Sequence, residues 1–215
     1  MPSRSDRVAL TALVVGLGAY DIIRRLAIPG QWSPWANTAM IGGVAAVAAL
    51  AGLTVDEVGL ARRHLGAGVR WGAVGTAAVG AVVLAARGIA GPMPSLTADH
   101  VGVSGWEMLL TVFVRIPIAT VLFEELAFRG TMLPLLRRVT HEHTAWATSS
   151  VLFGMWHLAP IWGSSTVNLF GTFAATVAGG AAFIWLRVRS QSLVAPLMVH
   201  WATNGLALLI VWLLR

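Results

Sequence analysis

The chain has 215 residues, of which 57% are hydrophobic and 11% are charged, and its mean hydropathy is +0.75. Soluble domains contain about 45–50% apolar and ~25% charged residues. A lipid bilayer must therefore cover much of this surface, which excludes a water-soluble enzyme and a disordered chain. The sequence has no cysteine, and this excludes disulfides, thiolate nucleophiles and cysteine metal sites.

The formal net charge is +6, and all 15 basic residues are arginine. Arginines that bind nucleic acid gather in a stripe on one face, whereas these stand singly or in pairs between apolar blocks. Such a distribution is typical of the loops of a membrane protein. We therefore expect a lipid bilayer, and no nucleic acid, as a partner of this chain.

Seven segments approach the roughly 20 apolar residues that cross the hydrocarbon core of a bilayer. In chain order they are Val8–Leu26, Trp35–Leu53, Trp71–Ala90, Trp106–Val139, Trp146–Trp162, Val167–Leu186 and Leu193–Leu213. The sequence shows no internal repeat. We therefore expect an all-α fold, a polytopic integral membrane bundle of about seven transmembrane helices that forms a single integral domain.

The first segment is the least certain crossing, because Asp21, Arg24 and Arg25 crowd its end. Its apolar run from Val8 to Tyr20 also has the length of a signal-peptide core. Because no small-x-small cleavage site follows, we expect a retained helix. Residues 1–54 thus form a predicted N-terminal pair of transmembrane helices.

Residues 55–70 are polar and amphipathic, with the sequence DEVGLARRHLGAGVR from Asp56. We expect this segment to be a helix that lies at the membrane interface rather than crossing the bilayer. Residues 71–215 form the predicted catalytic core, and the two prolines in 91–102 predict an exposed loop there. In the following segment, we expect a bend near Pro117 and a projection past the bilayer toward Arg137 and Arg138.

The arginines orient the bundle through the positive-inside rule. With the N-terminus in the cytoplasm, nine arginines lie inside (Arg4, Arg7, Arg62, Arg63, Arg70, Arg137, Arg138, Arg187, Arg189) and four outside (Arg24, Arg25, Arg87, Arg215). We therefore predict a multi-pass protein of the plasma membrane with a cytoplasmic N-terminus and an external C-terminus.

Six polar side chains stand where a bilayer rejects them. They are Glu124, Glu125, Arg129, His157, His200 and Asn204, on three predicted helices. A charged side chain at the centre of a spanning helix costs at least about 2.5–3.5 kcal/mol, so each needs a partner, a wet cavity or a function. Their number on so few helices indicates one shared site.

The spacing of these groups supports a shared site. Glu125 and Arg129 are four residues apart on one helical face, in the favourable order of acid before base, and His200 and Asn204 have the same spacing. A hairpin that folds in the turn VTHEHT places Glu124 and His157 about 16 residues from its tip, at the same depth of ~25 Å. His200 matches that depth only approximately.

Structural interpretations compete with this one. Glu125 and Arg129 can form a purely structural ion pair, and His200 with Asn204 can hydrogen-bond neighbouring helices together. A proton-coupled transporter or a non-enzymatic scaffold can also place carboxylates and histidines inside a membrane. Holding helices together, however, does not need two adjacent carboxylates, and a transporter should show repeat symmetry, which is missing here.

Three short motifs in this sequence resemble those of a known family. Glu124-Glu125-Leu-Ala-Phe-Arg129, Phe153-Gly-Met-Trp-His157 and His200-Trp-Ala-Thr-Asn204 are similar to the motifs EExxxR, FxxxH and HxxxN. They occur in that order in the CPBP (CaaX protease and bacteriocin-processing, or Abi) family of intramembrane proteases, which includes the type II CaaX prenyl endopeptidases. The resemblance covers roughly Asp56–Leu214. It implies an endopeptidase that acts on a membrane-associated peptide or protein, prenylated or bacteriocin-like.

Peptide hydrolysis needs an activated water and a group that stabilises the oxyanion. We expect Glu124 to act as the base that activates the water and His157 to orient it. His200 and Asn204 can donate hydrogen bonds from one helix face, which suits an oxyanion hole, and the resemblance implies that role too. No cofactor is required in this interpretation.

Three further residues support the predicted catalytic group. We expect Arg129 to lock Glu125 in place, and Phe153 to pack against the site one turn before His157. A second chemistry is open to the same residues: Glu124, His157 and His200 form a set of ligands for a catalytic zinc ion. The zinc alternative lacks an HExxH motif, and we favour metal-independent catalysis by glutamate.

Overall fold

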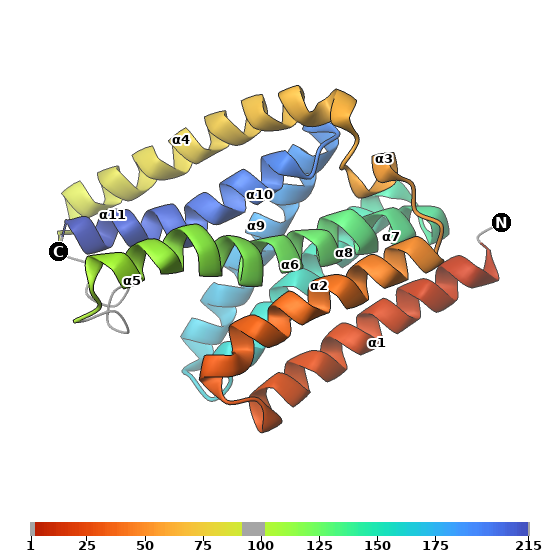
Figure 1. The fold of residues 1–215 in the computed structure, drawn as a ribbon, viewed down its shortest axis with the longest axis horizontal. Coiled ribbons are helices and arrows are strands. Elements are labelled where there is room, and N and C mark those ends of the chain that lie inside the picture. Colours follow the sequence, from red (N-terminus) through yellow and green to blue (C-terminus); the bar gives the residue numbers. More distant parts are fainter. Residues whose placement is uncertain (1–2, 92–101, 215) are drawn as a thin grey trace.

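The computed structural model describes residues 3–91 and 102–214, and all regular elements in these ranges are helices (Figure 1). The helices within residues 3–91 are α1 (Arg4–Ala27), α2 (Ser33–Leu50), α3 (Val55–Val58) and α4 (Leu65–Ala90). Those within residues 102–214 are α5 (Gly105–Leu110), α6 (Phe123–Glu125), α7 (Leu133–Val139), α8 (Glu142–Leu158), α9 (Thr166–Ser190), α10 (Val194–Trp201) and α11 (Ala207–Leu213). The all-α expectation is confirmed. The loop predicted at 91–102 lies almost entirely outside the described residues.

Among the described residues, four helices are long and apolar enough to cross a membrane. They are Val55–Ala90, Gly105–Val139, Thr166–Ser190 and Val194–Leu213. The three remaining predicted crossings correspond to α1, α2 and α8, which form helices but do not meet the same criteria. A multi-pass membrane protein is thus supported, and the crossing by these three helices stays a prediction.

The central helix, Gly105–Val139, runs through the middle of the bundle, with α1 and α2 on one side and α4, α10 and α11 on the other (Figure 1). It begins at a capping box in which Ser104 Oγ accepts from the Glu107 amide and Glu107 Oε2 accepts from the Ser104 amide. Where the sequence predicts a bend at Pro117, the structure has π-helical winding over Thr111–Leu122. A second π-helical stretch spans Leu126–Met132.

The amphipathic segment is not the single interfacial helix that the sequence predicts. The short helix α3 ends at Gly59, whose left-handed backbone (φ 87°) stops the winding. A 3-10 turn, Arg62–His64, follows, and Leu65–Arg70 already belongs to α4. A Cβ at Gly59 would lie 2.5 Å from the Arg187 guanidinium. The close approach of Arg187 therefore also requires glycine at this turn.

Small residues let two helix pairs pack closely, as expected in membrane bundles. Three glycines of α4 face α10 and the turn before it: Gly68 faces Ser192, Gly72 faces Met198 and Gly75 faces Val199. In α8, a Cβ at Gly154 would lie 2.5 Å from Val177 of α9. Both contacts border the helices that carry the predicted site, and they fix how far apart those helices lie.

Arg138 joins the N-terminal helices to the central helix. Its Nη1 donates to Asp6 Oδ1 (3.0 Å) and to the Ala51 carbonyl (2.9 Å), while its Nε and Nη2 donate to the two carboxylate oxygens of Glu57 (2.9 and 2.8 Å). One guanidinium thus binds α1, the end of α2, and α3. This bidentate and branched geometry uses the planar fork that distinguishes arginine from lysine.

Candidate active site

The two adjacent acids lie in α6, between the two π-helical stretches of the central helix. Glu124 is 6% exposed and Glu125 is fully buried. His157 comes from the end of α8 and His200 from α10. Three separate helices therefore supply the four groups.

Glu125 is held by two donors on one oxygen. Its Oε1 accepts from Arg129 Nη1 at 2.9 Å and lies 2.8 Å from Nδ1 of His200. Arg129 is fully buried, donates to the Gly180 carbonyl at 3.3 Å, and places its guanidinium 4.0 Å from the ring centre of Phe153. Breaking one side of such a buried pair typically costs about 3–5 kcal/mol, so this pair fixes the local geometry.

Glu124 has one oxygen held and one directed at the histidines. Oε1 accepts from the indole Nε1 of Trp156 at 3.1 Å. Oε2 is buried, has no hydrogen-bond partner among the described residues, and lies 3.7 Å from Nε2 of His157 and 3.7 Å from Nε2 of His200. Three polar atoms from three helices thus face one point.

The contacts of the two imidazoles determine where their protons lie. His157 Nδ1 is 2.8 Å from the Phe153 carbonyl, which can only accept, so Nδ1 donates. His200 Nδ1 donates to the Glu125 carboxylate, which also pairs with Arg129. In a neutral imidazole the other nitrogen is then an acceptor. Both Nε2 atoms and Glu124 Oε2 can therefore accept hydrogen bonds from a donor between them, such as water.

Aromatic rings enclose this group. The ring of Phe153 lies 4.5 Å from that of His157 and 5.9 Å from that of His200, centre to centre. Phe183 of α9 stacks on His200 at 4.9 Å with an interplanar angle of 23°. These apolar rings lower the local polarity around His200, which strengthens the electrostatic interactions on that side of the site, while His157 remains partly exposed.

Asn204 lies farther along the last helix and does not join this cluster in the described structure. It is partly exposed, and its side-chain oxygen accepts from Thr203 Oγ1 at 3.4 Å. The π-helical stretch Ala202–Leu206 carries it. The structure therefore brings Glu124, Glu125, Arg129, Phe153, His157 and His200 together and leaves Asn204 at the edge.

The family model of Rce1-like type II CAAX prenyl endopeptidases matches residues 106–206. Those residues belong to that family. No curated protein and no solved structure matches the chain. The Rce1-like segment begins at the start of the central helix and ends just beyond Asn204, so it contains all the predicted site residues.

The Rce1-like family is a family of proteases, so the chain is an enzyme that hydrolyses peptide bonds. Its helices include four that are long and apolar enough to cross a membrane. The protein is therefore an intramembrane protease. The resemblance drawn from the three motifs is confirmed, and the enzyme interpretation is favoured over a transporter or a scaffold.

Two neighbours of the Rce1-like site were missed from the sequence. Trp156 binds Glu124 directly, and Phe183 stacks on His200. Trp156 could have been found, because it immediately precedes His157 and must lie near it. Phe183 gave no such signal, since a phenylalanine in an apolar helix is ordinary.

The alternative to catalysis by glutamate alone is a catalytic zinc ion bound by Glu124, His157 and His200. Histidine nitrogen and carboxylate oxygen are atoms that zinc binds. In residues 3–91 and 102–214, however, no group of three or more His, Cys, Asp or Glu side chains is arranged to hold a metal ion. We therefore derive no reaction step through zinc.

Proposed function

We propose that this protein cleaves a peptide bond of a membrane-associated substrate with Glu124 as the general base. The observation that supports this most is the position of Glu124 Oε2, buried and 3.7 Å from each imidazole Nε2. This separation is too long for a direct hydrogen bond and suits a water that bridges the three atoms. Glu124 would take a proton from that water as it attacks the substrate carbonyl, and then pass the proton to the leaving amine.

The remaining groups would orient the water and stabilise the oxyanion. His157, held by the Phe153 carbonyl, positions the water. His200 would donate to the oxyanion through Nε2 as an imidazolium, whose second proton comes from solvent before the water attacks, and Glu125 at its Nδ1 would stabilise that positive charge. The Thr203 hydroxyl donates a hydrogen bond to the side-chain oxygen of Asn204. The NH₂ group of Asn204 is therefore the part of this side chain that can donate to the oxyanion.

An apolar cavity of about 270 Å³ suggests where the hydrophobic part of a substrate would lie. It is lined by residues of α1, the central helix and α8, among them Leu17, Phe128, Met155 and Trp156. Trp156 separates this cavity from Glu124, to which its indole is bonded. A prenyl chain or the apolar side chains of a bacteriocin-like peptide would bring the adjoining peptide bond toward Glu124.

We further propose that α1, α2 and α8 complete seven crossings of the plasma membrane, with the N-terminus in the cytoplasm. In this arrangement residues 1–54 form two N-terminal crossings, and residues 71–215 form the catalytic core. Large exposed side chains on these helices, such as Val15, Ile22 and Leu50, are 58–89% exposed. Contact with lipid would account for such exposure.

Replacing Glu124 by Gln tests the proposed base. We expect Glu124→Gln to lower the rate of peptide cleavage by about 10³-fold, within the range that general bases contribute, while the protein still inserts and folds. Cleavage is measured by mass spectrometry on purified protein in vesicles, with a prenylated peptide and its unprenylated counterpart as substrates.

The matched control is Glu107→Gln in the same helix, because glutamine preserves the capping box at Ser104. It should cleave like the wild type. If Glu124→Gln retained full activity in correctly folded protein, Glu124 would not be the base.

The zinc alternative, with Glu124, His157 and His200 as ligands, is decided by metal removal. If glutamate alone activates the water, protein stripped of metals with a chelator should retain its cleavage rate within about twofold. Loss of activity that zinc alone restores would establish the metalloprotease instead. Elemental analysis of the stripped sample serves as the control for complete removal.

A further inference from the structure

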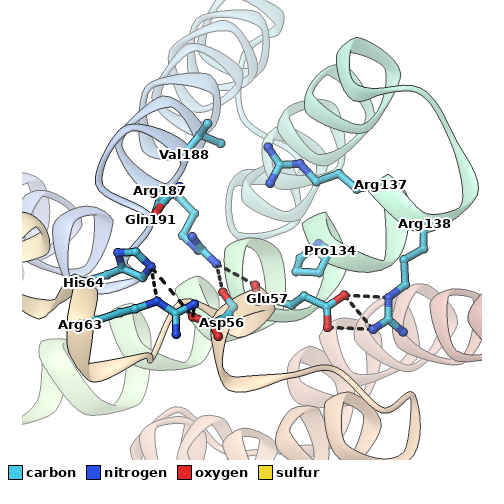
Figure 2. A pocket seen from close by; sticks show the side chains of 10 residues that line it. All are labelled: Asp56, Glu57, Arg63, His64, Pro134, Arg137, Arg138, Arg187, Val188 and Gln191. Atoms are coloured by element: carbon cyan, nitrogen blue, oxygen red, sulfur yellow. Dashed lines mark hydrogen bonds and ion pairs between the residues drawn. The ribbon is translucent and has the colours of Figure 1, made fainter.

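A polar cavity that none of the active-site residues lines lies where α3, α7 and α9 meet (Figure 2). Its volume is about 420 Å³. Four arginines line it: Arg63, Arg137, Arg138 and Arg187. The proposed protease function uses none of them, so this cavity needs a separate explanation.

The carboxylates that line the cavity are already paired. Asp56 lies 2.6 Å from Arg63, and Glu57 lies 2.7 Å from Arg138. Neither acid forms an ion pair with Arg187, on which Asp56 acts only at longer range. Arg137 reaches outward to Glu142, the first residue of α8.

Arg187 has no such counter-ion. It is only 6% exposed, and no carboxylate lies within ion-pair distance of it among the described residues. Its Nη2 donates to the backbone carbonyls of Asp56 (3.1 Å) and Glu57 (2.7 Å). A buried cation that is paired only with neutral carbonyls is costly unless an anion joins it.

Two donors remain for an anion. Nε of Arg187 and Nε of Arg137 are buried and have no hydrogen-bond partner among the described residues. Figure 2 shows both side chains at the same cavity, Arg187 from α9 and Arg137 from α7. Like charges that share a cavity repel each other, and an anion between them would remove this repulsion.

The cavity also lies where three candidate membrane spans end. Three candidate spans end around it: Val55–Ala90 begins there, and Gly105–Val139 and Thr166–Ser190 finish there. Basic pockets between transmembrane helices at this level suit lipid head groups, and guanidinium groups suit phosphate oxygens. We propose that this cavity binds a phosphate group, supplied by the head group of an anionic membrane lipid.

Lipid binding by the purified full chain tests this site. The protein in an uncharged detergent is titrated with phosphatidylglycerol or with phosphatidylcholine of the same acyl chains, and bound lipid is counted by native mass spectrometry. We expect phosphatidylglycerol to bind more tightly. Arg187→Gln and Arg137→Gln should each weaken its binding by about tenfold, as the loss of one charged hydrogen bond implies.

The matched control is Arg189→Gln, which removes the same charge from the same helix. Arg189 is exposed and lies against Trp71 instead of the cavity, so this variant should bind within about twofold of the wild type. If Arg187→Gln fails to fold, as size-exclusion chromatography would show, Arg137→Gln decides, because its ion pair is with the partly exposed Glu142.

A second arm separates the lipid from free phosphate. Thermal unfolding is measured in sodium phosphate and in sodium chloride of equal ionic strength, without lipid. If phosphate stabilises the protein through Arg187 and Arg137 but phosphatidylglycerol does not bind, the cavity is a phosphate site. The proposal that a lipid head group supplies the phosphate would then be wrong. Equal loss of lipid binding in Arg189→Gln, or no effect of Arg187→Gln and Arg137→Gln in either arm, would overturn the site.

Discussion

Adjacent glutamates in this protein have different surroundings, although they share one turn of helix. Glu125 receives two charged or polar donors on one oxygen, from Arg129 and His200, and is closed off from any substrate. Glu124 receives a single neutral donor, the indole of Trp156. Glu124 is therefore the carboxylate with an oxygen left free to take a proton from a water beside the two imidazoles.

Trp156→Phe should separate the hydrogen bond of this indole from its packing. Phenylalanine keeps an apolar ring beside Phe123 and Phe128 but removes the donor to Glu124 Oε1. We expect kcat to fall about tenfold, the loss of one hydrogen bond to a charged group, with little change in KM, because the bond orients Glu124 instead of binding substrate. Steady-state peptide cleavage measures both constants.

Trp146→Phe is the matched control for this indole. Trp146 lies on the same helix and also donates to a glutamate, Glu142, but at the opposite end of α8. It should leave kcat unchanged. A rise in KM or a fall in thermal stability without a fall in kcat for Trp156→Phe would show that Trp156 only packs.

Candidate site residues could be predicted from the sequence where their side-chain type is rare in a membrane. Charged and imidazole side chains are unusual inside apolar segments, so Glu124, Glu125, His157 and His200 were selected as candidates. The bond from Trp156 and the stacking of Phe183 depend on side-chain directions across helices, which spacing alone does not give. For the same reason the placement of Asn204 at the edge of the cluster was not foreseen.

At the scale of helices, the contact of α4 with α10 sets the position of His200. Gly75→Ala would place a Cβ against Val199, a β-branched side chain that cannot easily turn away. We expect the free energy of unfolding to fall by about 1–3 kcal/mol, the usual cost of overpacking. Because Val199 precedes His200, cleavage activity should fall as well. Thermal unfolding in detergent and peptide cleavage measure the two effects.

Gly88→Ala provides the comparison, since a Cβ at Gly88 meets nothing within 4 Å. It should unfold no earlier than the wild type, because alanine favours the helix over glycine. Equal effects of the two substitutions would mean that helix propensity, and not the contact with α10, explains the result.

The helices could be predicted well, because a long apolar segment in a membrane must satisfy its backbone hydrogen bonds internally, which a helix does. Six of the seven predicted segments begin and end within about four residues of the observed helices. The seventh, Trp71–Ala90, ends with α4 at Ala90, but α4 already begins at Leu65. The break at Gly59 was missed, because a polar amphipathic pattern continues across it. The π-helical winding was missed too, since it depends on packing around Pro117 and not on a periodic pattern.

Across the whole molecule, the arginine bias predicts which end faces the cytoplasm. The chain contains no cysteine, so one introduced cysteine gives one labelling site. We expect His141→Cys, in the turn after α7, to react with a membrane-impermeant maleimide only when the cytoplasmic side is accessible. Gln31→Cys, in the turn after α1, should react from outside intact cells. Both residues are exposed.

The reverse labelling pattern would invert the orientation. Because α2, α4 and the central helix lie between the two cysteines, labelling of both from the same side would show that α2 does not cross the bilayer as these other two helices do. The two N-terminal helices are the least predictable part of the whole, because Asp21, Arg24 and Arg25 lower the apolar content of α1 while α2 is short. Packing on the central helix, which hydropathy does not record, holds them in the bundle.

The π-helical stretch Thr111–Leu122 precedes Phe123–Glu125, so the number of residues in this stretch determines which way the side chains of Glu124 and Glu125 point. Each residue of an α-helix turns the chain by about 100°, and a π-helical stretch absorbs residues that regular winding would not. Removing one amino acid between 111 and 122 would therefore swing Glu124 away from the two imidazoles. Over evolution, this stretch should tolerate exchanges of side chains but resist insertions and deletions.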